Sequence, residues 1–138
     1  MPDLTEAQTA LVAALVGEVP HPSWLRLFLN AEILEQPDGY DLDTLAFAIR
    51  RDGTGRLEDP QLRLGPATRA AIVGLYEALE AAQGSRLGSF DLVVDFPGRY
   101  RFELSYDPPK RLNGIWDRER EQWLESYLER YAAEGGEA

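Results

Sequence analysis

Four stretches of this chain alternate apolar and polar side chains with a period of two residues, the period of a β-strand. They cover residues 24–33, 44–50, 90–96 and 100–106. Turn-forming residues separate the members of each pair, Gln36-Pro37-Asp38-Gly39 in the first and Pro97-Gly98 in the second. The pattern therefore predicts two hairpins, and hairpins are typical of an antiparallel sheet.

The apolar residues of these strands predict which face of the sheet is buried. We expect that face to be made by Leu27, Phe47, Leu92 and Phe102. In the second hairpin the apolar residues of both strands have even numbers. For the two apolar sets to lie on one face of the sheet, the numbers of two directly opposed residues must therefore add up to an even number. A three-residue loop, 97–99, preserves that parity and places Asp95 opposite Arg101, a favourable cross-strand pair.

Three helices are predicted, over residues 4–17, 66–83 and 117–132. Asp3 and Glu6 form a capping box for the first, Pro66 suits the first position of the second, and Asp117 caps the third. The element order is α-β-β-α-β-β-α, an α+β fold with a four-stranded antiparallel sheet packed against helices. A chain of 138 residues has the size of one domain. We expect that domain over residues 1–134, followed by a frayed tail at 135–138.

Charge and cysteine content narrow the function classes. The chain carries 24 acidic and 14 basic residues, a formal net charge of −10. Such a surface repels nucleic acid and anionic lipid and attracts a basic partner. No cysteine is present, which excludes thiol catalysis and cysteine-based metal sites. The first residues lack a basic region and no apolar run is long enough for a membrane span, so we expect a cytoplasmic protein.

Residues that could carry catalysis are sparse. His21 is the single histidine of the chain. A metal site or a catalytic triad needs further ligands or partner residues beside one histidine. Gly53-Thr54-Gly55 lacks the Lys-Ser/Thr of a phosphate-binding loop. We therefore expect no catalytic residue, no metal and no cofactor.

The polar face of the predicted sheet carries carboxylates and apolar residues together. Its acidic side chains are those of Asp91, Asp95, Glu103 and Asp107. Paired carboxylates can do acid–base work or bind a divalent cation, but a solvated or partner-facing surface explains the alternation better. By the same alternation, the face also carries Trp24, Phe28 and Val93. Apolar anchors among charges suit a protein interface, and the other interpretation is that the last helix covers this face.

In their order and spacing, these segments resemble the YezG-like family of bacterial immunity proteins, the antitoxin partners of polymorphic nuclease toxins. The resemblance lies in Trp24 and the Ala31-Glu32 pair of the first strand, Leu75-Tyr76-Glu77-Ala78-Leu79 in the middle helix, Phe102-Glu103-Leu104-Ser105-Tyr106-Asp107 in the last strand, and Trp116 with the 123–131 helix. It covers roughly residues 20–130. The sequence departs from the family in its Pro108-Pro109 insertion.

The resemblance implies a non-catalytic immunity protein that occupies the cationic cleft of a toxin. A basic toxin domain would be attracted to the acidic surface, and no chemistry would be needed from the inhibitor. The expected partner-binding residues are Trp24, Phe28, Glu32, Asp91, Asp95, Glu103 and Asp107. We expect a monomer or a weak homodimer. A second hypothesis is an acidic chaperone for a secreted effector, dimeric through the amphipathic stripe from Trp123 to Tyr131.

Overall fold

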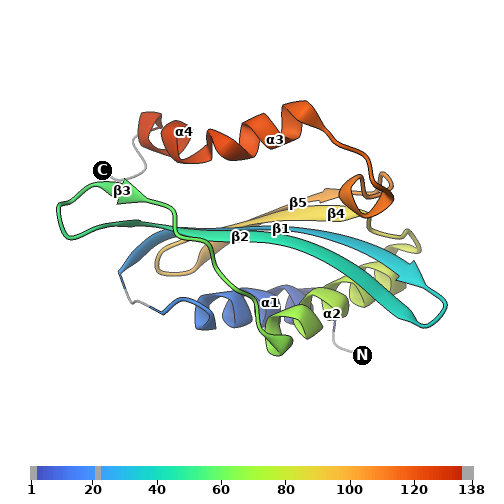
Figure 1. Ribbon diagram of the computed structural model, residues 1–138. Coiled ribbons are helices and arrows are strands. Elements are labelled where there is room, and N and C mark those ends of the chain that lie inside the picture. The colour runs from blue at the N-terminus through green and yellow to red at the C-terminus, as the bar shows by residue number, and fades with distance from the viewer. Residues whose placement is uncertain (1–2, 21–22, 135–138) are drawn as a thin grey trace.

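The computed structural model describes residues 3–20 and 23–134, which form an antiparallel sheet covered by helices on both faces (Figure 1). The sheet has five strands in the order β3-β2-β1-β4-β5. The strands are β1 (Trp24–Gln36), β2 (Gly39–Arg51), β3 (Leu57–Glu58), β4 (Ser89–Asp95) and β5 (Arg99–Ser105). The helices are α1 (Leu4–Gly17), α2 (Pro66–Gln83), the short 3-10 helix η1 (Arg111–Asn113), α3 (Arg118–Glu125) and α4 (Tyr127–Ala133).

The first two helices begin and end where local sequence signals predict. Asp3 caps α1, its carboxylate accepting a hydrogen bond from the Glu6 backbone N–H at 2.8 Å. Pro66 occupies the first turn of α2. Gly84 ends α2 with a positive φ of 71°, a backbone conformation that glycine adopts without strain. The predicted bounds 4–17 and 66–83 are confirmed.

Among the described residues, the structure has one strand, one α-helix and one short 3-10 helix more than predicted. Residues 57 and 58 pair with β2 as the short strand β3, in a segment where the alternation predicts no strand. The single helix predicted over 117–132 is two helices that meet at Ser126. The Ser126 hydroxyl donates to the Gln122 carbonyl oxygen at 3.0 Å, a contact that competes with the backbone hydrogen bonds of a helix and bends it.

The prediction that Phe47 shares a face with Leu27 is wrong. Gln36 pairs with Gly39, so the first hairpin has a two-residue loop, Pro37-Asp38. Facing residues then have an odd sum, and Leu27 lies opposite Ala48 while Phe28 lies opposite Phe47. A register change by one residue moves every side chain of a strand to the other face.

The second hairpin keeps the predicted parity but not the predicted pairs. Its loop is Phe96-Pro97-Gly98, and Asp95 lies opposite Arg99 and not Arg101. Arg101 is still an electrostatic partner of Asp95, because its Nη1 lies diagonally 3.8 Å from Asp95 Oδ2. Leu92 and Phe102 face each other on the same side as Leu27, as predicted.

Two apolar clusters fill the spaces above and below the sheet. The larger lies between the sheet and the α1–α2 pair and includes Leu11, Leu27, Leu75 and Leu92. The smaller lies on the other face, under α3 and α4; its buried members are Phe28, Phe47, Ile49, Val93, Leu124, Tyr127 and Tyr131. None of the described helices combines the length and the hydrophobicity that a membrane crossing needs.

Candidate partner-binding site

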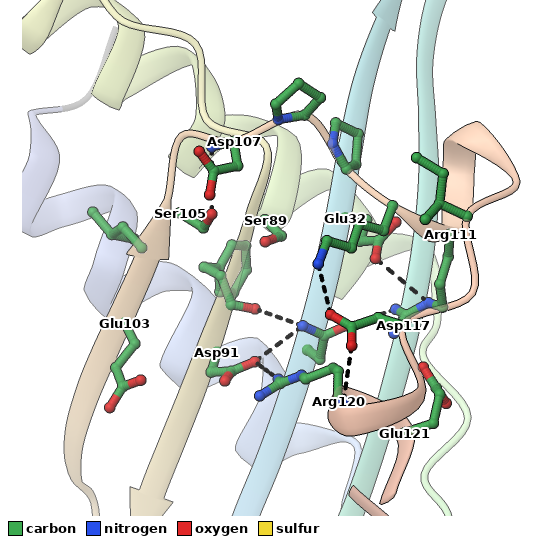
Figure 2. A pocket seen from close by; sticks show the side chains of 17 residues that line it. Glu32, Ser89, Asp91, Glu103, Ser105, Asp107, Arg111, Asp117, Arg120 and Glu121 are labelled. Atoms are coloured by element: carbon green, nitrogen blue, oxygen red, sulfur yellow. Dashed lines mark hydrogen bonds and ion pairs between the residues drawn. The ribbon is translucent and has the colours of Figure 1, made fainter. Parts of the chain in front are cut away.

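A cleft of about 270 Å³ opens where the β4–β5 end of the sheet meets the segment that leads into α3 (Figure 2). Its floor comes from residues of β1, β4 and β5, and its wall from residues 107–121. The lining residues are Asn30, Glu32, Ser89, Phe90, Asp91, Glu103, Leu104, Ser105, Asp107, Pro108, Pro109, Lys110, Arg111, Ile115, Asp117, Arg120 and Glu121.

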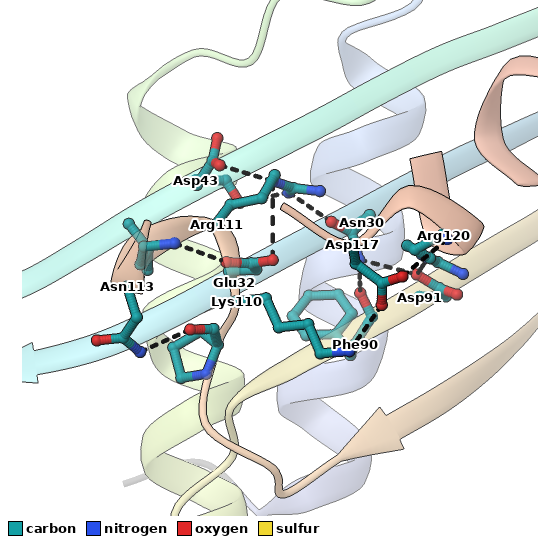
Figure 3. A network of polar contacts seen from close by, with 12 residues as sticks. Asn30, Glu32, Asp43, Phe90, Asp91, Lys110, Arg111, Asn113, Asp117 and Arg120 are labelled. Atoms are coloured by element: carbon teal, nitrogen blue, oxygen red, sulfur yellow. Dashed lines mark hydrogen bonds and ion pairs between the residues drawn. The ribbon is translucent and has the colours of Figure 1, made fainter. Parts of the chain in front are cut away.

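Arg111 attaches one end of this wall to the sheet (Figure 3). Its Nε donates to Asp43 Oδ2 on β2 at 2.6 Å, and its Nη2 donates to Asn30 Oδ1 on β1 at 2.5 Å. Glu32, whose side chain is 8% exposed, lies 3.7 Å from the same guanidinium and accepts the Leu112 backbone N–H at 3.0 Å. A buried carboxylate needs such partners, since an unpaired charge in this position would be costly.

A second group of contacts fixes the start of α3. Asp117 caps the helix, because its Oδ1 accepts the Arg120 backbone N–H at 3.1 Å. Its other oxygen accepts from Lys110 Nζ at 2.7 Å. This hydrogen bond lowers the pKa of Asp117 and raises the pKa of Lys110. The Arg120 guanidinium forms an ion pair with Asp91 on β4, and Asp91 also accepts from Asn30 Nδ2 at 3.0 Å.

The cleft carries more negative charge than its cations neutralise. Its lining contains six carboxylates and three cationic side chains. All three cations, Lys110, Arg111 and Arg120, have carboxylate partners within the domain. Among the described residues, no ion pair is formed by the carboxylates of Glu103, Asp107 and Glu121. These three charges are therefore available to a cation from outside.

Apolar side chains lie beside these carboxylates. Ile115 lines the cleft and is 55% exposed, and the next residue, Trp116, is 71% exposed. Exposed apolar residues next to charges are typical of protein interfaces.

The proposed anchors Trp24 and Phe28 are not on this surface. A β-bulge at Leu25 shifts the register, so that Trp24 pairs with Arg50 while Arg26 pairs with Ile49. Trp24 consequently faces α1 and α2 and is 5% exposed. Phe28 does lie on the outer face, but Phe47, Trp123 and Tyr127 surround its ring at 4.9 to 6.0 Å, and it is 0% exposed.

Some of the predicted carboxylates form ion pairs with arginines of the domain, and the others are exposed in the cleft. Glu32 is buried against Arg111, Asp91 pairs with Arg120, and Asp95 pairs with Arg26 at 2.6 Å. Glu103 and Asp107 are exposed in the cleft. Of the seven expected partner-binding residues, the structure thus brings two together as open acidic groups and uses the other five inside the fold.

Several residues of the cleft were missing from the expected site. Arg111, Ile115 and Glu121 come from the segment after the sheet, which the sequence pattern treats as a link and a helix. The Pro108-Pro109 pair was the available signal, because two prolines end the strand and turn the chain back over the outer face.

Among the described residues, no group of three or more Asp, Glu or His side chains is arranged to hold a metal ion. His21 lies outside the described residues. What the open carboxylates can do chemically is attract, hydrogen-bond and hold a cationic group.

Comparisons with known proteins place no further constraint on this site. No protein-family model matches the sequence, and no curated protein is similar to it at a significant level.

Proposed function

We propose that this domain is a non-catalytic immunity protein that binds a basic toxin domain through the cleft between β5 and α3. One observation carries the proposal. Among the described residues, the cations that line the cleft are paired, whereas Glu103, Asp107 and Glu121 form no ion pair. Exposed Ile115 lines the same cleft, and exposed Trp116 follows it in the chain.

This surface suits the active site of a nuclease toxin for an electrostatic reason. An enzyme that cleaves nucleic acid presents a cationic cleft to the phosphates of its substrate. A rigid acidic surface is steered towards that cleft and competes with the substrate for it. Ile115 and Trp116 would supply the apolar contacts that slow dissociation, the role expected earlier for Trp24 and Phe28.

The chaperone hypothesis loses its main support. It required the stripe from Trp123 to Tyr131 as a dimer surface. Tyr127 and Tyr131 are instead buried against the domain's own sheet. A chaperone of that design would have to give up this packing in order to dimerise.

Co-expression with the toxin encoded beside this gene tests the proposal. The Asp107→Lys, Glu121→Lys double variant should lose protection, because it reverses two open charges of the cleft. The Asp38→Lys, Asp59→Lys double variant makes the same change in net charge at exposed positions outside the cleft and should protect fully. Circular dichroism would verify that both variants are folded.

Two results would contradict the proposal. A folded Asp107→Lys, Glu121→Lys variant that protects as well as wild type would place the interface elsewhere. The absence of any neighbouring toxin, together with normal growth of host cells that lack this gene, would reject the immunity function itself.

A further inference from the structure

The two edges of the sheet differ in whether another segment of the chain hydrogen-bonds to them. At the β2 edge, the Ala48 backbone N–H donates to the Pro60 carbonyl at 3.0 Å and the Leu62 N–H donates to the Ala46 carbonyl at 2.9 Å. An irregular, proline-containing segment therefore occupies that edge. At the other end, β5 pairs with β4 over all seven of its residues without a bulge, and no strand among the described residues pairs with its outer edge. A regular, uncovered edge is a template for another strand.

The backbone groups at this free edge belong to Tyr100, Phe102 and Leu104. The Phe96 N–H, just beyond the end of β4, donates to the Leu25 carbonyl of β1 at 3.0 Å, and the Ser105 carbonyl of β5 accepts from the Gly88 N–H, just before β4, at 2.9 Å. Even-numbered residues of β4 thus direct their backbone groups towards β1, and odd-numbered ones towards β5. Because these directions alternate along antiparallel strands, odd-numbered residues of β5 face β4 and even-numbered ones face outward.

The side chains of β5 separate into two stripes. Tyr100, Phe102 and Leu104 lie on the α1–α2 side of the sheet, where Tyr100 and Leu104 are more than one-third exposed. Arg101 and Glu103 lie on the other side and are both exposed. One stripe is apolar, and the other carries opposite charges two residues apart.

We propose that β5 pairs antiparallel with β5 of a second copy of this chain, with Phe102 opposite Phe102 of the partner subunit. In this register Arg101 faces the partner's Glu103, and Glu103 faces the partner's Arg101. Tyr100 faces the partner's Leu104 on the apolar side. The outward backbone groups of Tyr100, Phe102 and Leu104 meet their counterparts, and two sheets join into one.

The charges select this register over its neighbours. A shift by one residue would oppose apolar and charged side chains. Pairing centred on Arg101 would place two arginines face to face, and pairing centred on Glu103 would do so with two glutamates. Like charges directly opposite each other destabilise a strand pair, whereas opposite charges and apolar pairs stabilise it. The strand is self-complementary in the way that a two-fold interface requires.

Charge-swap variants test the pairing directly. Sedimentation velocity at about 0.15 M salt limits the general repulsion between two acidic chains, because the Debye length is then about 8 Å. Wild type should form more dimer as its concentration rises. Arg101→Glu alone and Glu103→Arg alone should each weaken the dimer about tenfold or more, because both cross-strand pairs become like-charged.

An equimolar mixture of the two single variants should form a heterodimer, since every cross-strand pair between them is again oppositely charged. The Arg101→Glu, Glu103→Arg double variant should dimerise with itself for the same reason. Amide hydrogen exchange adds a backbone measurement: the N–H groups of Tyr100, Phe102 and Leu104 should become protected as the concentration rises.

A wild type that is monomeric at every soluble concentration would overturn the proposal. So would a dimer that both folded single variants retain with unchanged affinity. The experiment contains no toxin and leaves Asp107 and Glu121 intact, so its failure is distinct from a failure of the proposed function.

Discussion

The Arg111 guanidinium lies 2.6 Å from the carboxylate of Asp43, a residue 68 positions earlier in the chain. This contact ties η1 to β2, and the hydrogen bond of the same guanidinium to Asn30 ties it to β1. The wall of the cleft is therefore held by side chains from both strands of the first hairpin.

Replacing Arg111 with Met should lower the free energy of unfolding by about 2–3 kcal/mol, because the buried Glu32 carboxylate would have one partner fewer. The cost should fall below that of a fully buried pair, since Asp43 is partly open to solvent. Urea denaturation measures it. Arg86→Met is the control: its pair with Glu80 is solvent-exposed, so the change should cost less than about 1 kcal/mol. Equal losses in the two variants would contradict this account of the Arg111 network.

Replacing Phe28 with Ala should destabilise the protein by about 3–5 kcal/mol, since the ring is buried between the sheet and α4. Trp116→Ala removes a larger ring that is mostly exposed and should change stability by less than about 0.5 kcal/mol. The same two variants should rank in reverse order for toxin affinity measured on folded protein. A Phe28→Ala variant of wild-type stability would show that α3 and α4 do not cover this face in solution.

Gly88→Ala should be strongly destabilising, by more than about 2 kcal/mol, because an added Cβ would overlap the Asp107 carbonyl oxygen at 1.8 Å. That close approach brings the Asp107 end of the cleft against the start of β4. Gly74→Ala is the matched change within α2, where no described atom beyond the adjacent residues and the helix's own backbone lies within 4 Å of the new Cβ, and it should stabilise by about 0.5–1 kcal/mol. Thermal or urea unfolding of both variants should show shifts of opposite sign.

Ionisation of the Tyr76 hydroxyl should lower the free energy of unfolding of the protein in alkaline solution. Burial raises the pKa of Tyr76 to about 12, aided by the hydrogen bond from its hydroxyl to Glu35 at 3.0 Å. The folded state therefore keeps a proton that the unfolded chain releases above about pH 10. The contribution of protonated Tyr76 to the free energy of unfolding is complete below pH 10 and is lost as the pH rises towards 12.

Urea midpoints of wild type and Tyr76→Phe across this pH range provide the measurement. The variant should be less stable than wild type near neutral pH, because it lacks the hydrogen bond, and the difference should shrink as the pH rises. A difference that stays constant with pH would contradict the raised pKa of Tyr76.

Local signals were sufficient for much of the fold. Asp3, Pro66 and Gly84 act within one turn of the helix that they begin or end, so the bounds of α1 and α2 follow from the sequence. Alternation located the four long strands for the same reason, because the period of two is a property of each strand alone. The α+β class follows from the order of these elements.

Which side chains share a face of the sheet depends on how two strands pair, and not on the sequence of either strand alone. A two-residue loop at Pro37-Asp38 placed Phe47 on the opposite side from Leu27, and the bulge at Leu25 turned Trp24 away from the outer face. Neither feature changes the alternation within a strand. Each changes only which faces of two strands coincide, and that depends on the pairing between them.

The candidate site shows the same division. The sequence by itself determined that the chain is acidic and that Glu103 lies at a polar position of a strand. Asp107, which the alternation places on the same strand, lies beyond the end of β5 at Ser105. Only the tertiary structure decided that Glu32, Asp91 and Asp95 are neutralised within the domain and that Glu121 joins the open carboxylates. Whether a charge is open or paired depends on arginines up to 79 residues away along the chain, Arg26, Arg111 and Arg120, and folding alone brings them into contact.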